Sequence, residues 1–251
     1  MSLEKSILEF NDTIKVLRSE NGCPWDREQT HGSLRACIME EAAELQAAIR
    51  IYENTGDFEN MKEELGDLLL QVVMQSCIAE EEGLFTLEDV VSTVQEKMIR
   101  RHPHVFGDVQ VADSGEVLKN WDEIKRQEKE KYSRKISPLR EIPNELPSLT
   151  RMSKVLKKVN KIYQETKSEA DSFTEIKESM EQIRCLLAEK KEIDQNNIEK
   201  SFTQVLLEVS NIAMKRKVHL EQLLNDRIED LIEEYEGDSH KRVVNEGNVD
   251  K

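Results

Sequence analysis

The sequence predicts an all-α protein. Of its 251 residues only 5% are aromatic and 35% are charged, and it contains just 9 glycines and 5 prolines. Sandwiches and barrels of short strands need far more turn-forming residues than this. Along most of the chain, apolar residues also recur every three or four positions, which is the spacing of helices with one buried stripe.

Several helices are expected in the first half of the chain. Residues 3–18 have one apolar stripe, and two longer helices, at about 34–52 and 59–82, are joined by "ENTGDF", where Gly56 suits a left-handed turn. Thr86 is placed to cap a fourth helix. A further helix is expected around residues 118–131.

The helix expected at 59–82 contains "LLLQVVMQSCIA" and is apolar around much of its circumference. Such a helix must be buried on several sides, which is more cover than one small bundle offers. The sequence therefore predicts a homodimer.

The chain is expected to form two tandem helical domains. Residues 133–148, "SRKISPLREIPNELPS", contain three of the five prolines and have the composition of a linker. The predicted organisation is a first helical domain at 1–132, this linker, a second helical domain at 149–236 and a disordered tail at 237–251.

Charge and hydropathy limit the possible partners. The net charge of −15 disfavours binding to nucleic acid or to an anionic membrane surface. No apolar run is long enough to cross a membrane, and the amino terminus "MSLEKSILEF" lacks the organisation of a signal peptide. A cytoplasmic location is expected.

Two pairs of acidic residues interrupt apolar helix faces. Glu41 lies on the stripe that also contains Leu34, Ile38, Leu45 and Ala48, and Glu44 is one turn further on. Glu64 and Asp67 are likewise one turn apart on the next helix. Two helices joined by a short turn pack antiparallel, so the pairs should face each other.

Four carboxylates facing one another require a neutralising cation or protons. Oxygen ligands without cysteine or histidine suit Mg²⁺, or Mn²⁺, better than zinc. Each pair alone is more often a solvated helix face. Gly66, between Glu64 and Asp67, adds to the case because glycine inside a helix costs about 1 kcal/mol relative to alanine and suggests a close approach.

Five segments in this order resemble the MazG family of nucleoside triphosphate pyrophosphohydrolases: "CPWDREQTHGSL", "EEAAEL", "EELGDLLLQVV", "RRHPHVFGD" and "NWDEIK". The resemblance implies a MazG-like helical bundle and a dimeric enzyme. It also implies Mg²⁺-dependent cleavage of nucleoside triphosphates into monophosphate and pyrophosphate, as in the clearance of unwanted nucleotides.

The resemblance also implies a set of site residues. The family's E-E-x-x-E and E-x-x-D motifs fall on Glu40, Glu41, Glu44, Glu64 and Asp67. By this correspondence the last four would ligate metal. Glu41 would also act in catalysis, and Glu40 would support the metals or orient water.

The family's phosphate and base contacts correspond to Lys97, Arg101, Trp121 and Lys125. Trp121 and Lys125 share a helix face, so an indole could stack on a base while the ammonium reaches a phosphate. Trp121 could equally be a packing anchor, and Lys97 and Arg101 could serve only the helix dipole. His102 and His104 are expected to pack in a turn rather than bind metal.

The second half departs from the family pattern. Glu178 and Glu181 keep part of the first motif, but Ser201 and Gln204 stand where carboxylates are needed. This degenerate metal motif predicts a structural, dimerising or regulatory domain.

Three hypotheses follow: a pyrophosphohydrolase that works through the first half, a catalytically weak nucleotide-binding regulator, and a helical scaffold. The retained acidic, basic and aromatic residues disfavour the scaffold, whereas the sequence does not separate the first two.

Overall fold

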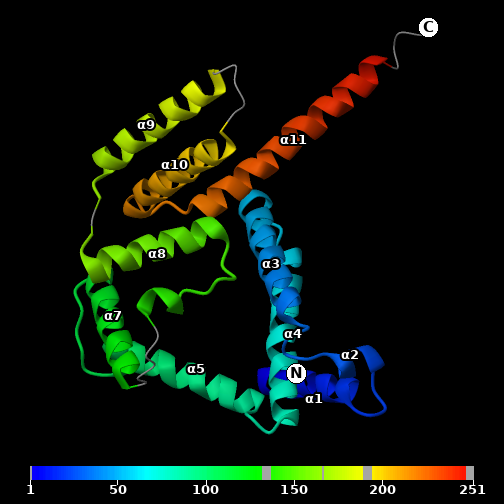
Figure 1. Ribbon diagram of the computed structural model, residues 1–251. Coiled ribbons are helices and arrows are strands. Elements are labelled where there is room, and N and C mark those ends of the chain that lie inside the picture. The colour runs from blue at the N-terminus through cyan, green and yellow to red at the C-terminus, as the bar shows by residue number, and fades with distance from the viewer. Residues whose placement is uncertain (1, 132–136, 166, 189–193, 247–251) are drawn as a thin grey trace. The chain divides into compact units, whose positions relative to one another are not determined.

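The protein is all-α, as the sequence predicts. The computed structural model describes residues 2–131, 137–165, 167–188 and 194–246, and every regular element in these ranges is helical (Figure 1). The chain divides into two compact units, Met1–Ser133 and Arg134–Lys251. We call them the first and the second unit. None of the described helices is both long and apolar enough to cross a membrane.

The described residues of the first unit, 2–131, form seven helices. Their bounds are α1 Leu3–Arg18, α2 Pro24–Glu28, α3 Arg35–Thr55, α4 Glu59–Glu81, α5 Leu87–Arg101, α6 Pro103–Phe106 and α7 Ser114–Lys131. Gly56 ends α3 in the left-handed conformation, with φ of 77°. Thr86 caps α5 in a full capping box with Asp89. Both helix ends were predicted from the residue types.

Two short helices, α2 and α6, were not predicted. Each begins with a proline, Pro24 or Pro103, whose fixed φ favours the first helical position. The turn before α2 is tight at Gly22, where a Cβ would lie 2.2 Å from the carbonyl oxygen of Val16. The segment "CPWD" suggests a loop that packs Trp25, but this prediction is wrong, because Trp25 is 62% exposed.

The core of the first unit lies around the second half of α4. Its buried residues are Ile14, Leu34, Val73, Met74, Cys77 and Ile78. Helix α4 contacts α1, α3 and α5, and this explains why residues 73–79 are apolar or buried on nearly every side. At the end of α1 the Arg18 side chain, 4% exposed, reaches α4 and forms an ion pair of 2.7 Å with Glu81.

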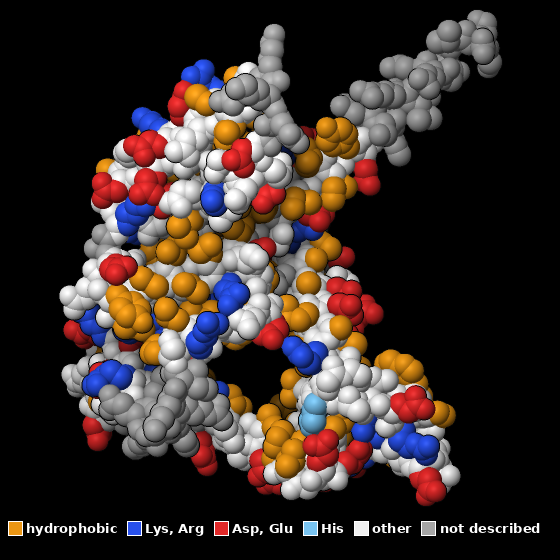
Figure 2. Space-filling view, in the orientation of Figure 1, with side chains coloured by type: hydrophobic (Ala, Val, Ile, Leu, Met, Phe, Trp, Pro, Cys, Tyr) orange, Lys and Arg blue, Asp and Glu red, His pale blue; other side chains and the backbone are white. Residues whose placement is uncertain are grey.

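The first half of α4 has a different surface. Leu65, Leu69 and Val72 recur at helical spacing and are all exposed. Other exposed apolar side chains occur on both units, and many are visible on the face shown in Figure 2. We call Leu65, Leu69 and Val72 the α4 apolar stripe.

Where the structure describes the second unit, a short 3-10 helix, η1 Pro138–Glu141, is followed by four helices: α8 Ser148–Tyr163, α9 Glu169–Ala188, α10 Gln195–Lys215 and α11 Leu220–Glu246. Helix α10 packs against both α8 and α9. The interior of the second unit is unusually polar, because six polar residues of α9 and α10 are buried: Ser172, Ser179, Ser201, Glu208, Ser210 and Asn211.

The end of the chain differs from the expected tail at 237–251. The backbone of α11 continues as a helix to Glu246, because a formed helix gains one hydrogen bond for each residue that extends it. Residues 247–251 lie outside the described residues, as do 132–136 within and beside the expected linker.

Candidate metal centre

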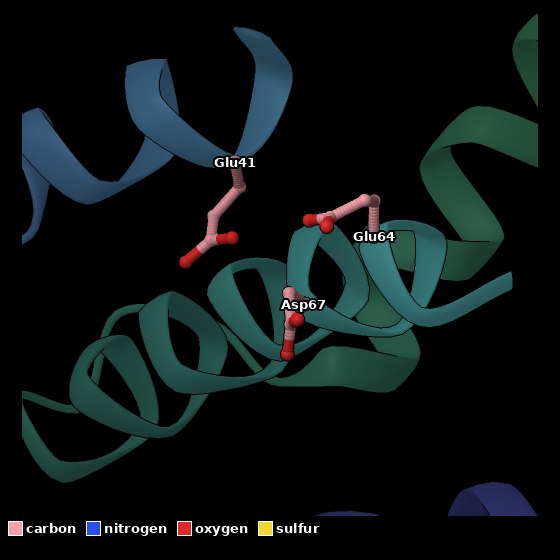
Figure 3. A group of neighbouring side chains, drawn as sticks. All are labelled: Glu41, Glu64 and Asp67. Atoms are coloured by element: carbon pink, nitrogen blue, oxygen red, sulfur yellow. The ribbon is translucent and has the colours of Figure 1, made fainter. Parts of the chain in front are cut away.

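The acidic site is built on the hairpin of α3 and α4. Because the turn at Gly56 reverses the chain, the first half of α4 lies against the middle of α3, and their acidic residues come together. Figure 3 shows Glu41 extending from α3 toward Glu64 and Asp67 on α4. One carboxylate oxygen from each of the three lies within 4.8 Å of the others. We call these three residues the acidic triad.

The triad is only partly shielded from water. All three side chains are half-buried, and Oε2 of Glu64 is buried without a hydrogen-bond partner among the described residues. An unpaired buried carboxylate oxygen is costly, so this atom favours a cation or another donor at the site.

The electrostatics of the triad also favour neutralisation. Burial raises the pKa of Glu41, and the negative charges of Asp67 and Glu44 raise it further. The pKa of Glu64 is raised in the same way, first by burial and then by the charges of Glu44 and Asp67. A bound cation would remove this repulsion.

Glu44 and Glu40 lie outside the triad. Both side chains are exposed, although the charge of Glu44 is near enough to affect Glu41 and Glu64. Of the predicted ligands, the structure therefore brings three together and leaves Glu44 at the edge.

Gln71 is a site residue that sequence reasoning missed. It is buried one turn after Asp67, and its Nε2 lies 3.5 Å from Oε1 of Glu41. Its own Oε1 has no partner within the described part of the chain. A polar residue in the middle of "LLLQVV", seven positions after Glu64, was the available signal.

The predicted substrate-binding residues lie on α5 and α7. Arg101 forms an ion pair of 2.7 Å with Glu128 of α7, and both side chains are 17% exposed. Arg100 also pairs with Glu128, and the pKa of Glu128 is lowered to about 2 by its hydrogen bonds to Arg101 and Arg100. Arg101 therefore already has an anionic partner, which the sequence did not predict.

Trp121 packs within the same group of side chains. The Arg101 guanidinium lies 5.5 Å from the centre of its ring, and the His102 ring meets it edge-on at 4.9 Å. His102 also caps α5 and contacts the carbonyl oxygen of Met98 at 2.6 Å. The packing role expected for His102 is confirmed. Lys97 and Lys125, also half-buried, lie on α5 and α7 respectively.

The described residues of the second unit do not form such an acidic group. Ser201 contacts Gln182 at 3.2 Å, and the Gln204 amide donates to Glu175 and Glu208. Among the described residues, the only acidic group compact enough to hold a metal is the triad of the first unit.

Comparison with known proteins agrees with this geometry. The sequence model of the MazG nucleotide pyrophosphohydrolase domain matches residues 29–106, which contain the whole triad. The nucleoside triphosphate pyrophosphohydrolase/pyrophosphatase MazG of Thermotoga maritima is 37% identical over 227 residues, 90% of this chain and 83% of that protein. The nucleoside triphosphate pyrophosphohydrolase of Escherichia coli K12 is 34% identical over 194 residues, 77% of this chain and 72% of that protein.

The match to a third relative covers a smaller share of both proteins. The uncharacterized protein YabN of Bacillus subtilis is 47% identical over 148 residues, which are 59% of this chain but only 29% of that protein. The described residues form only helices, and the acidic triad lies on a two-helix hairpin inside the matched domain. These features define an all-α protein of the nucleotide pyrophosphohydrolase class. The chain belongs to the MazG family.

Proposed function

We propose that this protein hydrolyses nucleoside triphosphates to nucleoside monophosphate and pyrophosphate at the acidic triad, with Mg²⁺ as the cofactor and Mn²⁺ as a substitute. Hydrolysis of nucleoside triphosphates follows from membership of the MazG family and from the activity for which two relatives are named. The observation that carries the choice of site is the convergence of three carboxylate oxygens within 4.8 Å from two helices.

The residues of the triad fit a hard divalent cation. All the donors are carboxylate oxygens, and the unpartnered Oε2 of Glu64 supplies a ligand atom that no other described group uses. Glu41, Glu64 and Asp67 would hold the cation, and Glu44 would join them from the edge of the site. When bound, a divalent cation neutralises phosphate charge and lowers the pKa of a coordinated water.

The remaining predicted site residues would orient water and bind the substrate. The exposed Glu40 would orient water or support its neighbour Glu41. Lys97 and Lys125 would receive the phosphates, together with Arg101 once it releases Glu128. Trp121, whose ring already contacts Arg101 and His102, would offer its indole as a stacking surface for a base. These roles are carried over from the family motifs.

The second unit is assigned a role other than metal-dependent hydrolysis. Ser201 and Gln204 replace two anionic ligands, and both already make hydrogen bonds inside the unit. A homodimer formed through apolar faces, a cytoplasmic location and the absence of nucleic-acid partners remain predictions from the sequence.

The direct test is product analysis. The purified full-length chain is incubated with each nucleoside triphosphate and Mg²⁺, and pyrophosphate and orthophosphate are measured separately. Pyrophosphate and monophosphate in equal amounts are expected, and Glu64→Gln should produce neither. Orthophosphate as the first product would contradict the proposal. Triphosphate binding without turnover would instead support the nucleotide-binding regulator.

A further inference from the structure

Two neighbouring arginines at the end of α5 converge on one carboxylate of α7. Nε of Arg100 lies 2.8 Å from Oε1 of Glu128, and Nη2 and Nε of Arg101 lie 2.7 and 3.2 Å from its Oε2. Each carboxylate oxygen therefore accepts a hydrogen bond from a guanidinium. Guanidinium donors that converge on one small anion are also the arrangement with which proteins bind the oxygens of a phosphate group.

Two lysines lie on the same helix faces. Lys97 precedes Arg101 by one turn of α5, and Lys125 precedes Glu128 by one turn of α7. Both lysine side chains are half-buried, and α5 contacts α7. The region around Glu128 therefore contains more positive charge than one carboxylate can neutralise, and such a region attracts polyanions.

The ion pair is partly shielded from water. The side chains of Arg101 and Glu128 are each 17% exposed, and hydrogen bonds from both arginines lower the pKa of Glu128 to about 2. Partly buried charges are screened less by salt than exposed ones, so this carboxylate holds the arginines firmly. A phosphate group that approaches Arg101 must displace Glu128 or remain beside its negative charge.

Trp121 holds Arg101 independently of Glu128. The Arg101 guanidinium lies over the indole ring, 5.5 Å from its centre, where a cation–π interaction stabilises it. The His102 ring meets the same indole edge-on at 4.9 Å. Loss of the carboxylate would therefore free the N–H donors of Arg101 without releasing its side chain.

We propose that Arg100 and Arg101 form a phosphate-binding site in which Glu128 is an internal competitor of the ligand. The carboxylate weakens the binding of a polyphosphate, and it assists the departure of pyrophosphate by taking back the guanidinium donors. This inference rests on the proposed function for the identity of the polyphosphate. It adds to that function a residue that sets affinity without contacting the reacting atoms.

Pyrophosphate is the probe, because it is the expected product and the proposed reaction does not consume it. Its binding to the full-length chain is measured by calorimetry with Mg²⁺. Glu128→Gln removes the competing charge and should bind pyrophosphate about tenfold more tightly than wild type, the usual effect of one hydrogen bond to a charged group. Equal or weaker binding by folded Glu128→Gln, or no binding by either protein, would overturn the proposal.

Two further variants separate contact from net charge. Glu123→Gln removes an exposed carboxylate that pairs with Arg126 on the same helix, and it should leave pyrophosphate affinity unchanged. Glu128→Asp keeps the charge but shortens the side chain by one methylene, so it should tighten binding by less than Glu128→Gln does. It also tests the site if Glu128→Gln does not fold. An equal gain in Glu123→Gln, or no gain in Glu128→Asp, would contradict the proposal.

The gain must depend on the arginines. Arg101→Gln should weaken pyrophosphate binding, and Glu128→Gln added to this variant should restore much less affinity than it adds to wild type. A full tenfold gain in the absence of Arg101 would show that Glu128 acts through another group and would contradict the proposal.

Kinetics separate this inference from the proposed function. In Glu128→Gln the KM for a triphosphate should fall, inhibition by added pyrophosphate should become stronger, and kcat should not rise. If no triphosphate is hydrolysed by wild type, the proposed function fails, while the pyrophosphate affinities still decide the role of Glu128. Normal hydrolysis with an unchanged pyrophosphate affinity in Glu128→Gln would contradict only the role of Glu128.

Discussion

Nε2 of Gln71 lies 3.5 Å from Oε1 of Glu41, so a buried amide on α4 contacts the single triad residue contributed by α3. Such a contact limits the rotation of the carboxylate and keeps its other oxygen free to face Glu64 and Asp67. Gln71→Leu keeps most of the side-chain volume and removes the donor. We expect metal-dependent turnover to fall about 10- to 100-fold, the usual effect of losing a group that orients a metal ligand.

The measurement for Gln71→Leu is the Mg²⁺ concentration needed for half-maximal hydrolysis, together with the maximal rate. Gln75→Leu, four positions further along α4, is the matched control. Unchanged metal dependence in Gln71→Leu, with normal thermal unfolding, would show that Gln71 does not position Glu41.

Glu64→Gln is expected to abolish turnover and to stabilise the metal-free fold. Loss of a metal ligand should reduce activity by more than the roughly 100-fold seen for orienting groups, and removing one buried negative charge relieves the repulsion from Glu44 and Asp67. Activity and thermal unfolding without metal are compared with those of Glu63→Gln, the exposed neighbour. Glu41→Gln should behave like Glu64→Gln. If Glu41→Gln and Glu64→Gln both keep near-normal rates, the site is misplaced.

Glu128 predicts a pH-dependent contribution to stability. Its pKa is lowered from 4.5 to about 2 in the folded chain by its hydrogen bonds to Arg101 and Arg100. Because the folded pKa is the lower one, the stabilisation is fully present above about pH 4.5 and is lost as the pH falls toward about 2. Glu128→Gln should lower the free energy of unfolding by about 1–3 kcal/mol at pH 7.

Urea unfolding of wild type and Glu128→Gln at several pH values checks this. The difference between the two proteins should shrink steadily below pH 4.5. Glu123→Gln removes an exposed pair with Arg126 on the same helix and should change stability by less than about 0.5 kcal/mol. A difference for Glu128→Gln that does not vary with pH would exclude the ion pair as its cause.

The α4 apolar stripe predicts a specific dimer contact. A charge in an apolar interface remains unpaired when two chains associate, so Leu69→Glu should shift the chain from dimer to monomer. Leu118→Glu changes a leucine on α7 that is more exposed than Leu69, and it should leave the mass in solution unchanged. The measurement is the mass of wild type, Leu69→Glu and Leu118→Glu by sedimentation. A monomeric wild type, or a dimeric Leu69→Glu, would contradict the prediction.

The two halves should differ in activity. A fragment of residues 1–132 contains the triad and should hydrolyse triphosphates with Mg²⁺. A fragment of residues 149–251 should be inert, because Ser201 and Gln204 cannot replace carboxylate ligands. Each fragment must first be shown to be folded by circular dichroism. Turnover by the second fragment alone would reverse the assignment of the two units.

Local chemistry explains what the sequence could predict. The turn at Gly56, the cap at Thr86 and the facing of Glu41 toward Glu64 and Asp67 depend on residue type and helical spacing, which are visible in the sequence. Long side chains are different, because their partners are set by packing between helices. The pairing of Arg101 with Glu128 and that of Lys167 with Glu208 join residues far apart in the chain, so neither was anticipated.

Gly66 lies between two residues of the triad, and a Cβ added there would meet no described atom within 4 Å beyond its own helix. The close approach expected from the sequence is therefore not made by the described residues of this chain. Alanine at this position should favour the folded chain by about 1 kcal/mol. A Gly66→Ala variant that is more stable but hydrolyses triphosphates more slowly would show that α4 must yield locally beside the triad for the enzyme to turn over.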